Sequence, residues 1–183
     1  MSSWYETQMA KDLFPIFGAR AIRGIETNFF LSRMYTGKSA LLRVSQHLES
    51  HIKKEERRSL IITDSFTKKF IKNIEDYLNL IDMDYKVWSN VLPEAPLPSI
   101  EEGVKVCESY NPKVLIAIGG GSVMDTAKIV MLKYEKPDQN LLMIVPSLGG
   151  PLGLRKKIKY LIFIPTTTGT GSENSQDATI TDT

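Results

Sequence analysis

The sequence predicts an α/β fold in which helices cover both faces of a parallel sheet. Short apolar runs of strand length alternate with helix-length segments, and the runs are apolar at nearly every position, as buried parallel strands are. With 183 residues, 42% of them apolar and 24% charged, the chain suits one well-buried domain and is too short for two of ordinary size. We expect that domain over residues 31–183, after an N-terminal segment (1–30) that shows no clear period.

The first half of the domain alternates strands and helices in chain order. A short strand is expected at 33–36, followed by a helix over 39–53. One stripe of that helix is apolar at helical spacing: Leu41, Val44, Leu48 and Ile52. A buried strand, SLIIT, follows over 59–63, and Asp64 and Ser65 open the next helix. The apolar face of this second helix consists of Phe66, Phe70, Ile74 and Tyr77.

The second half continues the alternation, from a strand over 85–88 through a proline-broken loop. Ser99 is expected to cap a helix over 100–110, and Glu102 at the third helical position completes a capping box. The remaining elements are a strand over 114–118, a helix over 122–132 and a strand over 160–164. The apolar stretch 141–150 fits either a strand or a loop insertion.

A glycine-rich turn, GGGSVMDTAK from Gly119 to Lys128, directly follows the apolar strand VLIAI. Glycine lets the backbone turn tightly and approach a ligand closely. The helix that begins at Ser122 has unpaired N–H groups and the positive end of its dipole at this turn, an arrangement that binds phosphate. We therefore predict that Gly119, Gly120, Gly121 and Ser122 hold the pyrophosphate of a dinucleotide. A flexible turn between strand and helix is the alternative.

The strand YLIFI runs into a second polar segment, PTTTGTGSE, over residues 165–173. Four of the five residues 166–170 are threonines. Their hydroxyl groups, at the end of a buried strand, form a suitable polar rim for a cofactor. A turn satisfied by its own side-chain-to-backbone hydrogen bonds is the alternative.

Two other phosphate-binding motifs are excluded. A P-loop ends in Gly-Lys-Ser/Thr, whereas Lys128 follows Ala127 well inside the helix. The dinucleotide fingerprint G-x-G-x-x-G fails because Met124 stands where its last glycine belongs, and GTGSEN fails in the same way at Asn174.

Together, and in this order, the two segments resemble the motifs GGGSxxDxAK and PTTxGTGSE of the iron-containing alcohol dehydrogenase family. The resemblance extends over residues 33–183 and implies the Rossmann-like parallel sheet of the family's N-terminal, dinucleotide-binding domain, which is also dehydroquinate synthase-like. It implies dinucleotide contacts at Thr166, Thr167 and Thr170, and at Ser175, which stands where many relatives have threonine.

The resemblance also implies a reaction, the reversible transfer of a hydride between NAD and a primary alcohol or aldehyde. In the family, iron polarises the substrate oxygen and is bound by an Asp and three His in a helical second domain. Because this chain ends at Thr183, before those ligands, we expect it to contain no catalytic or metal-binding residue. The chain alone is then expected to bind dinucleotide without turnover, and the complete enzyme, with Fe²⁺, to be a homodimer.

Three charged residues near the motifs have more than one possible role. Asp64 ends the strand 59–63, where a carboxylate accepts hydrogen bonds from the adenosine ribose; the resemblance places it at the acidic position that favours NAD over NADP. Capping of the following helix is the alternative, and the two roles are compatible. Asp125 would oppose a pyrophosphate, so we interpret it as a brace for backbone donors of a nearby loop, such as the threonine turn. Lys128 is compatible with phosphate contact or with the solvent face.

The sequence departs from the family at Ala95, where relatives often have Asn before the proline, and at Lys113, where many have Asp. The first departure removes one polar cofactor contact. Two other functions remain open. One is an enzyme of the glycerol dehydrogenase or dehydroquinate synthase type with a different metal, against which the GTGSE segment argues. The other is a stand-alone nucleotide-binding module without catalysis.

The remaining candidate sites have simpler explanations. His47 and His51 lie one helical turn apart, but Leu48 stands where a metalloprotease needs Glu and the chain has no third histidine, so both are interpreted as flanks of an amphipathic helix. Cys107, the single cysteine, is expected in the core and fits a reducing, cytoplasmic compartment. The basic cluster 155–159 is expected to be a solvated loop rather than a nucleic-acid contact. No apolar run reaches membrane-spanning length.

Overall fold

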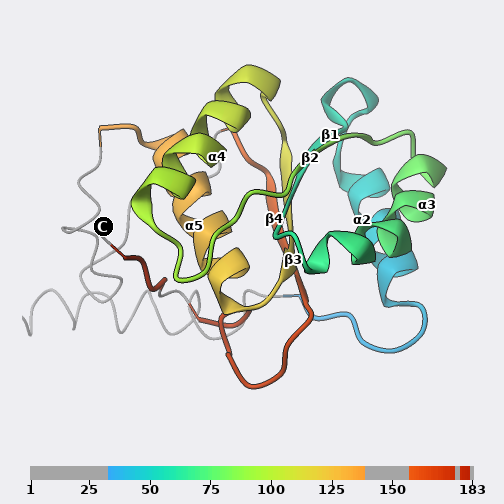
Figure 1. Cartoon of the computed structure of the whole chain (residues 1–183). Helices are drawn as coiled ribbons and strands as arrows, with labels where there is room; N and C mark the ends of the chain where they lie inside the picture. The colour runs from blue at the N-terminus through green and yellow to red at the C-terminus, as the bar shows by residue number, and fades with distance from the viewer. Residues whose placement is uncertain (1–32, 139–156, 176–177, 182–183) are drawn as a thin grey trace, which may run out of the picture.

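A four-stranded parallel sheet forms the centre of the molecule, in the order β2-β1-β3-β4 (Figure 1). The computed structural model describes residues 33–138, 157–175 and 178–181. The strands are β1 Arg58–Thr63, β2 Asp84–Trp88, β3 Val114–Gly119 and β4 Tyr160–Pro165. All three strand pairs are parallel. The predicted parallel α/β fold is therefore confirmed, and each of these four strands lies within one residue of its predicted bounds.

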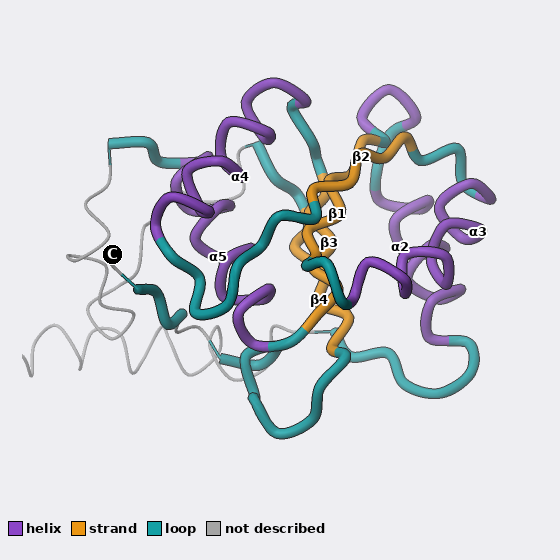
Figure 2. Tube along the Cα trace, viewed as in Figure 1, coloured by secondary structure: helices purple, strands orange, loops and turns teal. Residues whose placement is uncertain are grey.

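Helices cover both faces of this sheet, with α4 and α5 on one face and α2 and α3 on the other (Figures 1 and 2). The helices are α2 Ala40–His51, α3 Lys72–Leu80, α4 Leu97–Tyr110 and α5 Gly121–Glu135, with short 3₁₀ turns η2 Lys54–Glu56 and η3 Thr67–Ile71. All six residues of β3 are buried. Its Leu115 and Ala117 pack with the α4 and α5 side, whereas Ile116 and Ile118 pack with the α2 and α3 side. This alternation explains why the strand is apolar at every position.

The chain changes faces between β1 and β3, which are neighbours in the sheet. After β1 it continues through η3 and α3 on one face, and after β3 it continues through α5 on the other (Figure 1). In open α/β sheets, ligands bind outside the carboxyl ends of the strands at such a switch point. The fold alone therefore directs attention to the residues that follow β1 and β3.

The first part of the domain differs from prediction in two places. Residues 33–36 form no strand, because the described part of the chain offers them no neighbouring strand. Phe66 and Phe70, predicted to face the core, are 82% and 38% exposed. Of the four predicted residues only Ile74 is buried, and Ile71 and Leu78 complete the buried face. The cause is η3, which has three residues per turn and so rotates the apolar face before α3 begins.

Helix α4 begins earlier than predicted, at Leu97, and Ser99 lies inside it. The Ser99 hydroxyl donates to the carbonyl of Asn90 (3.2 Å). Glu102 Oε1 accepts from Trp88 Nε1 (3.0 Å) and from Asn90 Nδ2 (2.8 Å). The predicted capping box is therefore wrong, because both side chains bond to the end of β2 and the loop after it.

Other expectations fall on residues that the structure does not describe. These are the segment 1–30 and the apolar stretch 141–150, both outside the described ranges. Within those ranges, no helix has the length and apolar character needed to cross a membrane.

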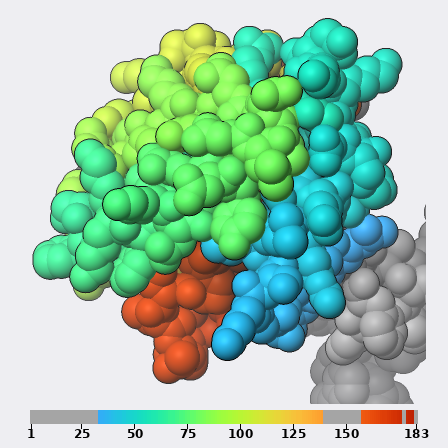
Figure 3. All heavy atoms as spheres, turned by 90° about the vertical axis from the view of Figure 1, so that its right-hand side faces the viewer, coloured from blue at the N-terminus to red at the C-terminus, as the bar shows by residue number. Residues whose placement is uncertain are grey.

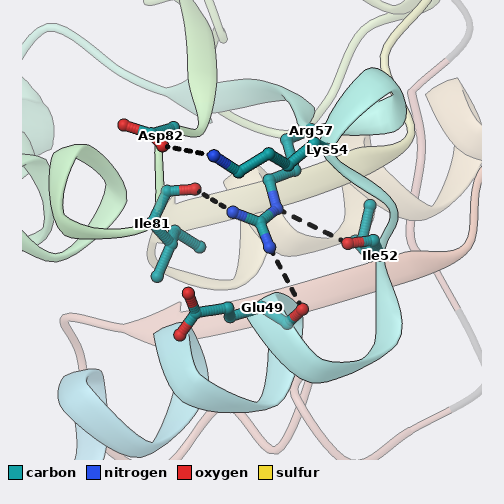
Figure 4. A network of polar contacts seen from close by, with 6 residues as sticks. All are labelled: Glu49, Ile52, Lys54, Arg57, Ile81 and Asp82. Carbon is teal, nitrogen blue, oxygen red and sulfur yellow. Dashed lines mark hydrogen bonds and ion pairs between the residues drawn. The ribbon is translucent and has the colours of Figure 1, made fainter.

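A buried cation ties two helices together at the amino end of the sheet (Figure 4). Arg57 is only 8% exposed, and its guanidinium donates to the carbonyls of Ile81 (2.6 Å), Glu49 (3.2 Å) and Ile52 (3.5 Å). These carbonyls lie at the C-terminal ends of α2 and α3, where the helix dipole favours a positive charge.

A buried carboxylate plays the converse role at the same end. Glu135, the last residue of α5, accepts the main-chain N–H groups of Lys157 (2.8 Å) and Ile158 (2.6 Å) with one oxygen. Ile158 is fully buried. The described part of the basic cluster 155–159 is therefore not the freely solvated loop that was expected.

Candidate functional site

The residues that follow β1 and β3 lie beside each other at the carboxyl end of the sheet. Thr63, the last residue of β1, donates its hydroxyl to the carbonyl of Ile118 near the end of β3 (2.8 Å). Thr67 donates to the same carbonyl (3.0 Å). Asp64 lies between these two threonines in the chain and is thereby held next to the glycine turn 119–121.

Asp64 has the helix-capping role that was one of its two predicted alternatives. Its Oδ1 accepts the N–H groups of Phe66 (2.8 Å) and Thr67 (2.7 Å), where η3 begins. Both bonds use the same oxygen, so the second carboxylate oxygen can accept a hydrogen bond from a ligand. The capping bonds also fix the orientation of that second oxygen.

The first glycine of the turn serves packing rather than an unusual backbone angle. A Cβ atom on Gly119 would lie 2.5 Å from Cγ2 of Val123, so only a glycine lets α5 lie this close to the end of β3. The three turn glycines have no positive φ, whereas Gly169 and Gly171 do. Close approach, and not backbone conformation, is therefore what the structure requires of the turn.

The second and third glycines face a hydroxyl-rich loop. A Cβ atom on Gly120 would lie 3.0 Å from Oγ1 of Thr167, and one on Gly121 would lie 3.3 Å from Oγ of Ser172. A side chain at either position would therefore fill the space between the turn and the loop.

Helix α5 begins at Gly121, one residue earlier than predicted, and its N-terminus lies at the same space. The N-cap residue, Gly120, has no side chain that could accept the first N–H groups. Such groups lack partners within the helix and carry the positive end of its dipole. Ser122, in the first turn, accepts the N–H of Glu94 with its hydroxyl oxygen (3.2 Å). Its hydroxyl proton can still be donated to an anion.

β4 continues into the threonine loop, residues 166–175. Thr166 N donates to the carbonyl of Gly119 (3.0 Å), which holds the loop against the glycine turn. Within the described structure, the buried hydroxyl of Thr166 has no hydrogen-bond partner. The alternative of a turn saturated by its own hydrogen bonds therefore does not account for Thr166.

The structure brings most of the predicted dinucleotide-binding residues to this one edge. They are Asp64, Gly119, Gly120, Gly121, Ser122, Thr166, Thr167 and Thr170. Ser175 lies at the far end of the threonine loop, where its hydroxyl accepts from Lys128 Nζ (3.3 Å).

A pocket of about 280 Å³ opens beside this edge on the α2 and α3 face. Its lining is mostly apolar and comes from four parts of the chain: Leu41, Phe70, Asn73, Ile74, Ile118, Ile164, Pro165 and Thr166. Figure 3 shows this face, where the red-orange end of β4 and the threonine loop meet the blue start of α2. Thr166, whose buried hydroxyl has no described partner, is one of the residues that line this pocket.

Asp125 braces a loop, as predicted, but the loop is not the threonine turn. Asp125 is buried, and its carboxylate accepts the N–H of Thr179 at Oδ2 (3.1 Å). Its Oδ1 accepts from Lys128 Nζ (3.0 Å), and the two side chains are 11% and 12% exposed. Lys128 therefore lies in a mostly buried ion pair rather than on the solvent face.

Two features of the site were not predicted from the sequence. Residues 178–181, hereafter the strap, run beside the loop before α4, and Thr181 forms a parallel bridge with Pro96. In that loop, Glu94 and Ala95 have φ values of 62° and 47°, a region that non-glycine residues rarely adopt. Asn tolerates this region better than Ala. The Asn that relatives often have at the position of Ala95 was therefore the one sequence feature that pointed to this left-handed conformation.

His47, His51 and Cys107 were predicted to be structural residues, and the structure agrees for all three. His47 Nδ1 lies 2.9 Å from the Arg33 guanidinium, and its ring centroid lies 4.1 Å from that of His51. Cys107 is fully buried, and this burial raises the pKa of its thiol to about 12, as expected of a core residue. Among the described residues, no group of three or more His, Cys, Asp and Glu side chains could hold a metal ion.

A parallel sheet with a glycine turn and an uncapped helix N-terminus at its switch point defines a Rossmann-like α/β domain. The family model described as iron-containing alcohol dehydrogenase matches residues 32–183, and the chain belongs to this family. The resemblance inferred from the two motifs is thereby confirmed.

Individual relatives agree with this assignment. The chain is 34% identical over 125 residues to the mitochondrial hydroxyacid-oxoacid transhydrogenase of Caenorhabditis elegans, and this match covers 67% of the chain and 27% of the relative. It is 32% identical over 146 residues to the bifunctional aldehyde-alcohol dehydrogenase of Escherichia coli, covering 74% of the chain and 16% of the relative. The iron-containing alcohol dehydrogenase of Thermococcus thioreducens superposes with a TM-score of 0.69 at 29% identity, over 82% of this chain and 40% of that one.

The chain thus spans about a quarter of the transhydrogenase, about a sixth of the bifunctional enzyme and two fifths of the solved structure. The matched part includes the sheet, the glycine turn and the threonine loop. Family membership places the chain among oxidoreductases.

Proposed function

We propose that the chain is the NAD-binding part of an iron-dependent alcohol dehydrogenase, which transfers a hydride reversibly between NAD and a primary alcohol or aldehyde. The observation that carries the proposal is the start of α5, where an uncapped helix N-terminus faces the threonine loop across Gly120 and Gly121. In the complete enzyme, Fe²⁺ and assembly as a homodimer belong to the same proposal.

We propose that the pyrophosphate binds in the space at the start of α5. It is bounded by the first N–H groups of the helix and by the hydroxyls of Ser122, Thr167 and Ser172. All of these groups can donate hydrogen bonds to phosphate oxygens, and the helix dipole adds a favourable field. A Cβ atom on either Gly120 or Gly121 would occupy this space.

The adenosine part fits the pocket on the α2 and α3 face. Side chains such as Phe70, Ile118 and Ile164 offer apolar walls for a planar base, and the volume of about 280 Å³ is near the lower end of small-ligand pockets. Asp64 is held beside the end of β3, so its second oxygen can accept from the ribose hydroxyls. The same charge opposes a 2′-phosphate, which favours NAD over NADP.

When bound, NAD supplies the carbon that accepts or gives up the hydride. The residues of this chain bind and orient it: Ser122 and the helix N-terminus hold the pyrophosphate, and the threonine loop closes over it. Thr166 contributes to the wall of the pocket on the α2 and α3 face. The described residues do not fit an iron site, because no three His, Cys, Asp or Glu side chains among them are grouped to hold a metal ion.

A second candidate function comes from the transhydrogenase relative, whose name gives a hydroxyacid and an oxoacid as its reactants. Its 34% identity exceeds the 32% of the aldehyde-alcohol dehydrogenase of Escherichia coli. Both candidates use the same nucleotide-binding edge and differ in the compound that exchanges the hydride. NADH formation with ethanol, and no conversion of a short hydroxyacid in the presence of an oxoacid as hydride acceptor, in the protein that contains the remaining family segments would favour the alcohol dehydrogenase.

Titration of the chain with NADH, followed by fluorescence, tests the proposal directly. We expect NADH to bind more tightly than NADPH, and Asp64→Gly to narrow or reverse this preference. Gly120→Val and Gly121→Val should abolish NADH binding because their side chains fill the phosphate space. Ser122→Ala should cost about 1 kcal/mol for one lost hydrogen bond.

Melting temperatures of the same variants separate lost binding from lost folding. Lys54→Ala, which removes an exposed ion pair at the other end of the sheet, is the matched control and should bind NADH normally. Unchanged NADH affinity in both valine variants would refute the phosphate assignment. Equal affinity of the unmodified chain for NADH and NADPH would refute the role of Asp64.

A further inference from the structure

The start of α5 belongs to a ring of hydrogen bonds that joins three distant segments of the chain. These segments are the loop 94–97, the first turn of α5, and the strap 178–181. In Figure 1 the strap is the dark red segment beside the loop that leads into α4. The ring closes around residues that the proposed function assigns to the pyrophosphate.

The strap is bound to the loop before α4 by three hydrogen bonds of Thr181. Its carbonyl accepts the N–H of Leu97 (3.1 Å), and its hydroxyl donates to the carbonyl of Glu94 (3.1 Å). Its N–H donates to the carbonyl of Ala95 (3.5 Å), which adds a weak third contact. The fourth link returns to α5 through Ser122, which accepts the N–H of Glu94 (3.2 Å). The two residues with left-handed φ are therefore held between the strap and α5.

Asp125 joins the strap to α5 from the other side. It accepts the N–H of Thr179 (3.1 Å), and it is paired with Lys128, which also contacts Ser175 of the threonine loop. A carboxylate one turn into a helix whose N-terminus is to hold phosphate is electrostatically unfavourable for that ligand. A carboxylate at this position therefore fits a role that outweighs this repulsion.

We infer that Asp125 is a positioning residue for dinucleotide binding, a role that rests on the proposed function. Its carboxylate holds the strap, and the strap holds Glu94 and Ala95 in a conformation that they adopt only when surrounding contacts enforce it. Through the Glu94 N–H, this loop fixes Ser122 and the first turn of α5 at the phosphate space. Lys128 neutralises the carboxylate and extends the brace to the threonine loop.

Substitutions at Thr179 test the link without changing any charge. Thr179→Pro removes the N–H that Asp125 accepts, whereas Thr179→Ala keeps it and alters only an exposed side chain. We expect Thr179→Pro to weaken NADH binding about tenfold, as the loss of one hydrogen bond to a charged group predicts, and Thr179→Ala to bind normally. Binding of adenosine, which has no phosphate, should be the same in both variants. A variant that merely destabilised the fold would weaken both ligands.

Substitutions at Asp125 separate positioning from simple repulsion. If Asp125 only opposes the phosphates, Asp125→Ala and Asp125→Asn should both tighten NADH binding. Positioning predicts that Asp125→Ala weakens it about tenfold, and that Asp125→Asn, which keeps an oxygen for Thr179, loses less. Amide hydrogen exchange should rise in the strap and in the first turn of α5 in the Ala variant, with core strands unchanged.

The outcomes distinguish this inference from the proposed function. Normal NADH binding by Thr179→Pro, or tighter binding by Asp125→Ala, overturns the inference and leaves the NAD proposal intact. Failure of the unmodified chain to bind NADH overturns the proposed function and, with it, the role assigned here to Asp125. Unchanged hydrogen exchange at the strap and the first turn in Asp125→Ala overturns the positioning link whatever the ligand.

Discussion

At the amino end of the sheet, buried ionised side chains bind the main chain, whereas at the carboxyl end main-chain donors face an open edge. Arg57 binds three helix-terminal carbonyls, and Glu135 binds two main-chain N–H groups. At the other end, α5 starts without a capping side chain, and the buried hydroxyl of Thr166 has no described partner. The Arg57 and Glu135 side chains thus bind main-chain groups at one end, whereas the first N–H groups of α5 have no capping side chain at the other.

Backbone conformation differs in the same direction. At the carboxyl end, Glu94 and Ala95 both have positive φ and are held by contacts from the strap and α5. A hollow of about 320 Å³ also exists at the amino end, but its lining residues belong to neither motif: Asn79, Asp82, Met83, Asp84 and Tyr85. The difference teaches that the amino end contributes stability, while the carboxyl end gives up stability where a ligand is to bind.

The largest expected effect concerns Arg57. Arg57→Met keeps an aliphatic chain but leaves three helix-terminal carbonyls without their donor, so unfolding free energy should fall by about 3 kcal/mol. Lys54→Ala is the control: the Lys54–Asp82 pair beside it is 70% and 75% exposed and should contribute less than about 0.5 kcal/mol. Urea denaturation measures both. Equal losses in the two variants would show that the buried network (Figure 4) does not stabilise the amino end.

Gly119→Ala and Gly120→Ala should separate stability from binding within one turn. The added methyl of Gly119→Ala meets Val123 at 2.5 Å, and overpacking of this kind should cost about 2 kcal/mol. The methyl of Gly120→Ala meets only the side chain of Thr167 at 3.0 Å, so the loss of stability should be smaller. NADH affinity should instead fall more in Gly120→Ala than in a correctly folded fraction of Gly119→Ala. The reverse ranking by melting temperature would contradict the division of roles.

Glu94→Gly should increase stability, because glycine adopts a φ of 62° without the cost that other residues bear. Relief of roughly 1–2 kcal/mol of strain, less the added freedom of the unfolded chain, leaves about 0.5 kcal/mol. Glu94→Ala removes the same side chain without relieving the backbone and should not stabilise. If both variants gain equally by thermal denaturation, the gain comes from the lost carboxylate and the loop stores no strain.

His47 provides the smallest test, at the amino end, where its ring meets Tyr160 edge-on. Partial burial, followed by the positive charges of His51 and Arg33, lowers the pKa of His47 below 6.5. The stability it contributes is therefore present above pH 6.5 and is lost as the pH falls through the lower folded-state pKa. Because the ring is largely solvated, the loss should be only about 0.3 kcal/mol. His47→Gln should show a correspondingly flatter decrease in denaturation midpoint between pH 7 and pH 5.5.

The sequence was most informative where a signal is local and repeated. Each predicted strand over 59–63, 85–88, 114–118 and 160–164 agrees with the structure within one residue, because a strand buried on both faces must be apolar throughout. Expectations that depended on a single side chain fared worse. Ser99 and Glu102 have the spacing of a capping box, yet both bond to the chain after β2. Residues 67–71 could not be recognised as a 3₁₀ turn, because the same residue types also form α-helices.

By itself, the sequence determined the four strands of the sheet, the order of the two motifs and hence the family, since all three reside in short contiguous segments. Only the tertiary structure decided which donors meet which acceptors at the site. Asp125 was recognisable as a brace, but its partner Thr179 lies 54 residues away and outside both motifs. The left-handed pair at Glu94 and Ala95 likewise carries no glycine and exists because the strap and α5 hold it. One hydrogen-bond partner stabilises a polar side chain about as much as another, so the sequence alone does not reveal which partner it has. The packed core decides the partner, because it fixes which segments lie side by side.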